Sequence, residues 1–162
     1  MKSQIATDSD DDWAALVPEL LVRDLATSLE FYLQGCGFRL RYARPEDGFA
    51  YLALGRAQLM LEEVTPGCWQ TAPLRSPFGR GMNLQIEVAD VHALHDRLQD
   101  RNQTFFRPLS TEWYRDGDLE HGQTQFLVQD PDGYLLRFMQ HLETRPCDPD
   151  RSGESTPSRR TV

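Results

Sequence analysis

The sequence repeats part of itself at an offset of 66 residues, and this repeat limits the folds that the chain can adopt. Residues Leu20–Leu25 (LLVRDL) are echoed by Ile86–Val91 (IEVADV), and the same offset aligns Tyr32 with Leu98. In each copy a short apolar stretch runs into an aspartate, a good helix N-cap, and apolar residues at helical spacing follow. Both copies are therefore predicted to begin with a strand and a helix.

Three strand-like stretches follow each predicted helix. Gly35 and Gly37 end the first helix, and glycine- and proline-containing turns separate the stretches after it. The predicted strands are Phe38–Ala43, Phe49–Leu54 and Ala57–Val64 in the first copy, and Thr104–Leu109, Gln123–Gln129 and Tyr134–Gln140 in the second. The pattern predicts an α+β fold made of two βαβββ modules.

The chain length of 162 residues suits one domain with one core. The predicted domain covers residues 13–144, with modules 13–64 and 82–144 joined by an irregular linker, 65–81. The polar ends, 1–12 and 145–162, are predicted to be disordered. Residues 110–122 are predicted to form a long loop that contacts either ligand or solvent, and Trp69 in the linker covers either the groove or a dimer contact.

Charge and composition exclude several classes of partner. The net charge is −8 with no basic stripe, so nucleic acid is not expected to bind, whereas a cationic ligand would be attracted. No run approaches the roughly 20 apolar residues of a membrane helix, and four aspartates lie among the first twelve residues. We expect a cytoplasmic protein without membrane partners. Its three cysteines are expected to be free thiols, since they are odd in number and widely spaced.

The order and spacing of three segments resemble the glyoxalase, bleomycin-resistance and extradiol-dioxygenase group, the vicinal oxygen chelate superfamily. These segments are Val17–Leu25 running into Ser28–Tyr32, then Gly37-Phe38, and finally Phe126–Phe138. The resemblance implies two modules that form an open curled sheet with a concave groove. It also implies that the protein forms a homodimer.

Enzymes of this group hold a divalent metal in the groove through residues on the first and fourth strands of each module. Carried over to this sequence, the four positions fall on Val17, Met60, Asn83 and Arg137. Valine has no donor atom, methionine is a soft ligand, and arginine is a cation that repels metal ions. We therefore expect no metal and no cofactor.

By motif, the chain is most similar to the bleomycin-resistance proteins, which bind a cationic, aromatic antibiotic without chemistry. Two aromatic groove positions of that subgroup fall on Tyr42 and Phe49. A tryptophan that the subgroup has before Gly122 is His121 here. The resemblance implies antibiotic sequestration as the function, with a different side chain from the subgroup's at position 121.

Side chains alternate between the two faces of a strand, so each old metal position identifies neighbours that also face the groove. The remaining positions on these strands are uniformly apolar and are predicted to form the core. Arg137 either binds ligand or neutralises Glu19 or Glu87 across the groove. The predicted ligand-binding set is Glu19, Tyr42, Phe49, Met60, Glu62, Asn83, Gln85, Glu87, Trp113, His121 and Arg137.

Two other functions stay open. The first is an enzyme of the same superfamily, such as a lyase, isomerase or dioxygenase-like protein, with an atypical site that uses Glu19, Glu87 or His121 as base. The second is a binding module for another natural ligand, because one fold can host many functions.

Overall fold

The computed structural model describes residues 13–147, and the predicted disorder of 1–12 and of 148–162 lies outside the described residues. The two predicted modules are confirmed, each with the element order βαβββ. The first contains β1 (Glu19–Val22), α1 (Leu25–Leu29) continued by a π-helical segment (Glu30–Cys36), β2 (Arg39–Arg44), a 3₁₀ turn (Pro45–Asp47), β3 (Phe49–Leu54) and β4 (Ala57–Glu63). The second contains β5 (Asn83–Glu87), α2 (Val91–Asp100), β6 (Phe105–Asp116), β7 (Leu119–Gln129) and β8 (Leu135–Pro146).

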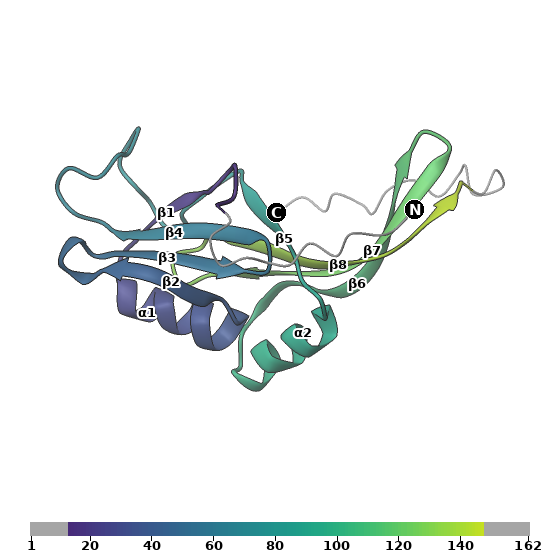
Figure 1. The fold of residues 1–162 in the computed structure, drawn as a ribbon, viewed down its shortest axis with the longest axis horizontal. Coiled ribbons are helices and arrows are strands. Elements are labelled where there is room, and N and C mark those ends of the chain that lie inside the picture. Colours follow the sequence, from purple (N-terminus) through teal and green to yellow (C-terminus); the bar gives the residue numbers. More distant parts are fainter. Residues whose placement is uncertain (1–12, 148–162) are drawn as a thin grey trace.

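Each module forms its own open, mixed sheet of four strands (Figure 1). Sheet 1 has the order β1-β4-β3-β2 and sheet 2 the order β5-β8-β7-β6. The first and last strands of each module pair in parallel, and the other neighbours are antiparallel. The sequence predicted one curled sheet, whereas the structure has two separate sheets with the same internal order.

The duplication extends to how each helix begins. Asp24 accepts a hydrogen bond from the backbone N–H of Thr27 at 2.7 Å, and Asp90 accepts one from that of Ala93 at 2.9 Å. The last strand of each module supplies a further acceptor. The side chain of Glu63 on β4 accepts from the N–H of Leu25, and Gln140 on β8 accepts from that of Val91. Equivalent strands thus fix the start of equivalent helices.

The two modules share one hydrophobic core, and α1 and α2 lie on the same side of the molecule (Figure 1). The predicted core face is confirmed, since its members are buried or pack against buried residues. These members are Leu20, Val22, Leu59, Leu61, Leu84, Ile86, Val88, Leu136 and Phe138. Because side chains alternate along a strand, the opposite face of each sheet turns away from this shared core.

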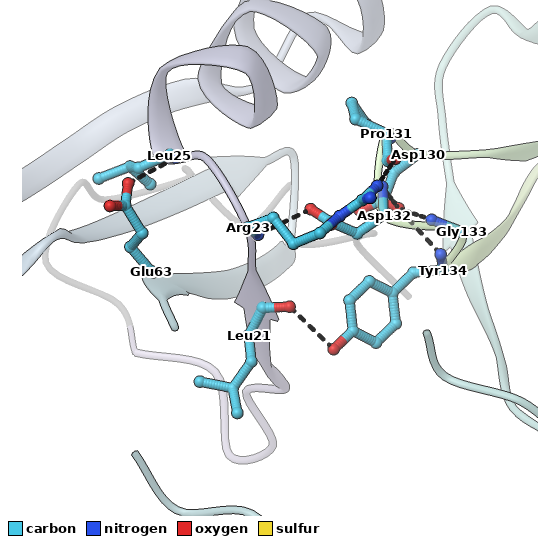
Figure 2. A network of polar contacts seen from close by, with 9 residues as sticks. All are labelled: Leu21, Arg23, Leu25, Glu63, Asp130, Pro131, Asp132, Gly133 and Tyr134. Carbon is cyan, nitrogen blue, oxygen red and sulfur yellow. Dashed lines mark hydrogen bonds and ion pairs between the residues drawn. The ribbon is translucent and has the colours of Figure 1, made fainter. Parts of the chain in front are cut away.

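A buried polar network joins the β7–β8 turn to the first module (Figure 2). One carboxylate oxygen of Asp130 accepts hydrogen bonds from the backbone N–H groups of Asp132, Gly133 and Tyr134. The other oxygen accepts the hydroxyl of the fully buried Tyr32 at 2.9 Å. Burial is the main reason why the pKa of Asp130 is raised.

Two further contacts attach the same turn to β1 (Figure 2). Arg23 forms an ion pair with Asp132, and the hydroxyl of Tyr134 donates to the carbonyl of Leu21 at 3.1 Å. Burial raises the pKa of Tyr134 to about 12, so this hydroxyl keeps its proton at neutral pH. The network holds the two modules in a fixed relative orientation.

The prediction of a long loop over 110–122 is wrong. These residues continue β6 and β7 as a hairpin, which extends beyond the body of the molecule (Figure 1) and turns at Gly117 with φ 61°. β8 runs to Pro146, so Arg145 and Pro146 pair with β7 and do not belong to a disordered tail. Backbone pairing creates these strands, since the residues have little apolar alternation.

The three cysteines are free, as predicted. Within the described residues, neither helix has the length and apolar character that crossing a membrane requires.

Candidate functional site

A cavity of about 430 Å³ lies on the face of sheet 1 that points away from the core. All four strands of the sheet and the loop after β4 contribute to its lining. The lining residues are Glu19, Tyr42, Arg44, Phe49, Met60, Glu62, Gly67, Cys68 and Trp69. Five of the predicted ligand-binding residues therefore meet around one cavity, which belongs entirely to the first module and the linker.

The strand register places two carboxyl groups side by side in this cavity. Glu19 pairs with Met60, and Glu62 lies two residues further along β4 on the same face. Burial raises the pKa of Glu19, and a hydrogen bond to Glu62 and the charge of that carboxylate raise it further, whereas Arg44 lowers it. A carboxyl group beside a second one holds its proton more tightly, because two neighbouring negative charges repel each other, and a bound cation would relieve this repulsion.

Aromatic rings form another part of the cavity wall. The rings of Tyr42 and Phe49 lie with their centroids 5.8 Å apart, and the Cζ atom of Arg44 sits 4.0 Å from the centre of the Phe49 ring. Trp69 lies at the rim with 93 % of its surface exposed. Such a surface can stack against flat rings and attract positive charge.

Trp13 borders the same aromatic group, and sequence reasoning did not single it out. Its ring packs edge-on against Tyr51 at 5.1 Å and against Tyr42 at 6.3 Å, and the backbone N–H of Ala14 donates to Gln58. Arg41 covers the indole, with Cζ 4.2 Å from the ring centre. The only signal in the sequence was an aromatic residue just before the Val17-Pro18 strand start.

Local hydrogen bonds shape the loop that closes the other side of the cavity. The Cys68 sulfur accepts from the backbone N–H of Thr65 at 3.0 Å and lies 3.8 Å from a carboxylate oxygen of Glu62. The backbone N–H of Cys68 in turn donates to the carbonyl of Thr65. These contacts hold the tight turn that carries Gly67 and Trp69 over the sheet.

Sheet 2 carries a second group of predicted residues, on its own outer face. Asn83, Gln85 and Glu87 are exposed on β5, and Gln85 lies in register with Arg137 on β8. Within residues 13–147, Arg137 forms no ion pair with Glu19 or Glu87, and its buried Nε atom has no hydrogen-bond partner. The neutralising contact that was one of the two alternatives for Arg137 is thus not formed.

Trp113 and His121 lie together on the extended hairpin, apart from the cavity. The Trp113 ring packs over Gly122, and the Cζ atom of Arg145 lies 3.5 Å from its centre. His121 contacts the hydroxyl of Thr144 at 2.9 Å and the carboxylate of Asp116 at 3.4 Å. Neither residue lines the cavity on sheet 1.

The side chains at the four metal positions do not fit a divalent ion. Met60 faces the sheet 1 cavity and Asn83 lines a different, largely apolar cavity, while Arg137 lines neither. Among the described residues, no three His, Cys, Asp or Glu side chains are grouped to hold a metal. A thioether, an amide and a guanidinium in separate places make a poor donor set.

Comparison with known proteins gives consistent matches over most of the chain. Residues 12–138 match the family model described as Glyoxalase/Bleomycin resistance protein/Dioxygenase superfamily. Bleomycin resistance proteins from Geobacillus stearothermophilus and from Staphylococcus aureus are each 27% identical over 139 residues, covering 79% of this chain and 97% of theirs.

Solved structures share the fold. The crystal structure of TioX from Micromonospora sp. ML1 has a TM-score of 0.63 at 22% identity, covering 80% of this chain and 100% of that one. A glyoxalase/bleomycin resistance protein/dioxygenase from Alicyclobacillus acidocaldarius has a TM-score of 0.58 at 20% identity, covering 85% and 96%.

Proposed function

This chain belongs to the Glyoxalase/Bleomycin resistance protein/Dioxygenase superfamily, and on that premise we propose that it binds an organic cation with flat aromatic rings without transforming it. The observation that carries the proposal is the cavity on sheet 1, which Glu19 and Glu62 line together with the rings of Tyr42 and Phe49. The bleomycin resistance proteins that it resembles make bleomycin, or a similar antibiotic, the first ligand to test. We place this activity in the cytoplasm.

Charge and stacking act together in this cavity. The positive group of a ligand would stabilise the Glu19–Glu62 pair, because it gives two neighbouring carboxylates a counter-charge. Aromatic walls bind flat rings through their faces and favour positive charge over them. A volume of about 430 Å³ lies within the range of small-molecule sites, though near its lower end.

A homodimer is part of the proposal, because the outer faces of the two sheets lie away from the shared core and are only partly covered within the described chain, on sheet 1 by Trp13 and the turn at Gly67. Glu19, Met60 and Glu62 face away from the shared core, as do Gln85 and Arg137 on sheet 2. If a second copy placed the outer face of its sheet 2 against the outer face of this sheet 1, the two faces together would form one groove. Light scattering should give twice the mass of one chain, and a monomer at micromolar concentration would refute this part.

Neutralising the carboxyl pair should weaken the binding of bleomycin. We expect Glu62→Gln and Glu19→Gln each to lower the affinity by about ten-fold, since each removes one negative charge from the cavity. Isothermal titration calorimetry measures the affinity. Mass spectrometry of bleomycin after long incubation with the protein should find it unchanged, which checks that it is not converted.

The matched control is Asp100→Asn, which removes the same charge from an exposed position at the end of α2. This variant should bind as the wild type does. Absence of binding heat for the wild-type protein at high micromolar bleomycin would refute bleomycin as the ligand. Equal losses in Asp100→Asn and Glu62→Gln would show that only net charge matters.

The affinity for a cation should also rise with pH. Because the pKa of Glu19 lies above its ordinary value of 4.5, this carboxyl keeps its proton to a higher pH than an ordinary glutamate does, and a bound cation competes with that proton. Affinity should therefore increase as pH passes upward through this raised pKa. Calorimetry at several values between about pH 5 and about pH 8 measures the trend. In Glu62→Gln the rise should move to lower pH, and an unshifted profile would assign it to another group.

The same carboxyl pair supports one alternative, an enzyme of the superfamily with an atypical site. A Glu19 carboxyl with a raised pKa is better suited than an ordinary glutamate to take or give a proton. Turnover of a bound organic compound, lost in Glu19→Gln, would favour this alternative over sequestration.

A further inference from the structure

Arg137 is a charged side chain on an inner strand of sheet 2 for which the described residues supply no hydrogen-bond or ion-pair partner. It lies on β8, between Gln85 on β5 and Leu127 on β7. Its Nε atom is buried and has no hydrogen-bond partner within residues 13–147. A guanidinium keeps its charge at every physiological pH, and a buried donor that is left unpaired is unfavourable. The position calls for an acceptor that the described chain does not supply.

The neighbouring side chains explain why Arg137 stays unpaired. Leu127, Leu135 and Met139 share its face of the sheet and have no strong acceptor. Gln125 is already engaged, since its Oε1 accepts from Gln123 and its Nε2 donates to the Tyr114 hydroxyl.

Glu87 is the nearest acidic residue on the same face of β5. Glu87 lies in register with Met139, which is two residues after Arg137 on β8. Glu87 and Arg137 form no ion pair. The carboxylate of Glu87 is exposed to solvent instead.

Gln85 adds a second donor beside the guanidinium. It lies in register with Arg137 on the adjacent parallel strand, so the two side chains project from the same face. The Gln85 amide is exposed and has no hydrogen-bond partner among the described residues. Two N–H donors side by side, one of them charged, match the two oxygens of a carboxylate.

We propose that Arg137 and Gln85 form a carboxylate-binding subsite on the outer face of sheet 2. This subsite rests on the proposed function, in which an organic ligand binds this chain. The new element is that the ligand carries a carboxylate as well as a positive group. A carboxylate of a second copy has the same chemistry, so the experiment must separate the two sources.

The subsite can be tested by NMR of the arginine Nε–H groups in the full chain, with benzoate and benzamide as a matched pair of probes. Benzoate should shift the Arg137 Nε–H signal in a saturable way, with an affinity about ten-fold or more above that of benzamide. Gln85→Ala should weaken the benzoate response, and Arg137→Gln identifies the signal by removing it. The exposed Arg75 provides an internal control that should not move.

Several results would overturn the subsite. The first is an Arg137 signal that benzoate leaves unchanged or that benzamide shifts equally. The second is a signal that moves on dilution of the protein and in Glu19→Gln, which would assign the acceptor to a second copy. The third is a shift in Glu87→Gln before any probe is added. Bleomycin calorimetry is independent of this assay, so benzoate binding without bleomycin binding would refute only the proposed function.

Discussion

Asp130→Ala is expected to destabilise the protein by about 3–5 kcal/mol, which corresponds to a fall in melting temperature on the order of 10 °C. Alanine leaves the backbone N–H groups of Asp132 and Tyr134 and the hydroxyl of the buried Tyr32 without their acceptor. The N–H of Gly133 keeps a second acceptor, the backbone carbonyl of residue 130. Each buried donor that loses its partner costs about 1–3 kcal/mol, and these three share one site, so the losses do not simply add. Urea denaturation followed by circular dichroism measures the change.

Asp130→Asn is the matched control, because its carboxamide oxygen can still accept the three backbone N–H groups. It should cost only about 1–2 kcal/mol. Tyr32→Phe, which removes the hydroxyl alone, should cost a similar amount and keeps the test possible if Asp130→Ala does not fold. An Asp130→Ala variant as stable as Asp130→Asn would show that the hydrogen bonds of this turn contribute little.

The stability of the wild-type protein should depend on pH through Asp130, and Asp130→Asn is the comparison. Since burial raises the pKa of Asp130 above its ordinary value, the folded state holds the proton more tightly than the unfolded chain does. The stability from this group is therefore complete below the unfolded pKa of about 3.9 and declines as pH rises through the folded value. Asp130→Asn cannot ionise and should lack this decline, which urea titrations at several pH values would detect.

Much of the fold was predictable because the alternation of apolar residues along strands and the N-cap residues of helices are both local features of the sequence. Strand alternation identified the core face, in which Leu20, Leu61 and Phe138 are now seen to be buried. The aspartates at 24 and 90 marked where the helices begin. The extension of the β6–β7 hairpin over residues 110–122 was missed, because it projects beyond the core and its residues show no alternating apolar pattern.

The candidate site was only half accessible to the same reasoning. Alternation indicates which residues share a face of one strand, and Glu19, Met60 and Glu62 do meet in one cavity. How the two modules sit together depends on contacts between residues far apart in the sequence, such as Arg23 with Asp132 and Tyr32 with Asp130. No local pattern encodes these contacts, so the sequence could not show that Arg137 lies outside that cavity.

The β7–β8 turn also depends on a glycine, and Gly133→Ala is expected to destabilise the protein by about 3–4 kcal/mol. Gly133 has φ 98°, a conformation that L side chains rarely adopt. A Cβ atom there would overlap the Cβ of Pro77 and lie 2.7 Å from its Cα. Pro77 cannot move aside freely, because the N–H of the next residue, Phe78, donates to the carbonyl of Asp132 at 2.8 Å.

Gly81→Ala separates the two causes of this loss. Gly81 has a similar φ of 85°, but a Cβ atom there meets nothing within 4 Å, so only the backbone cost of about 1–2 kcal/mol should remain. The difference between the two variants in urea denaturation then measures how tightly the loop around Pro77 packs on the turn. Equal losses would mean that this loop gives way easily and that the modules are joined mainly by the Asp130 network and the shared core.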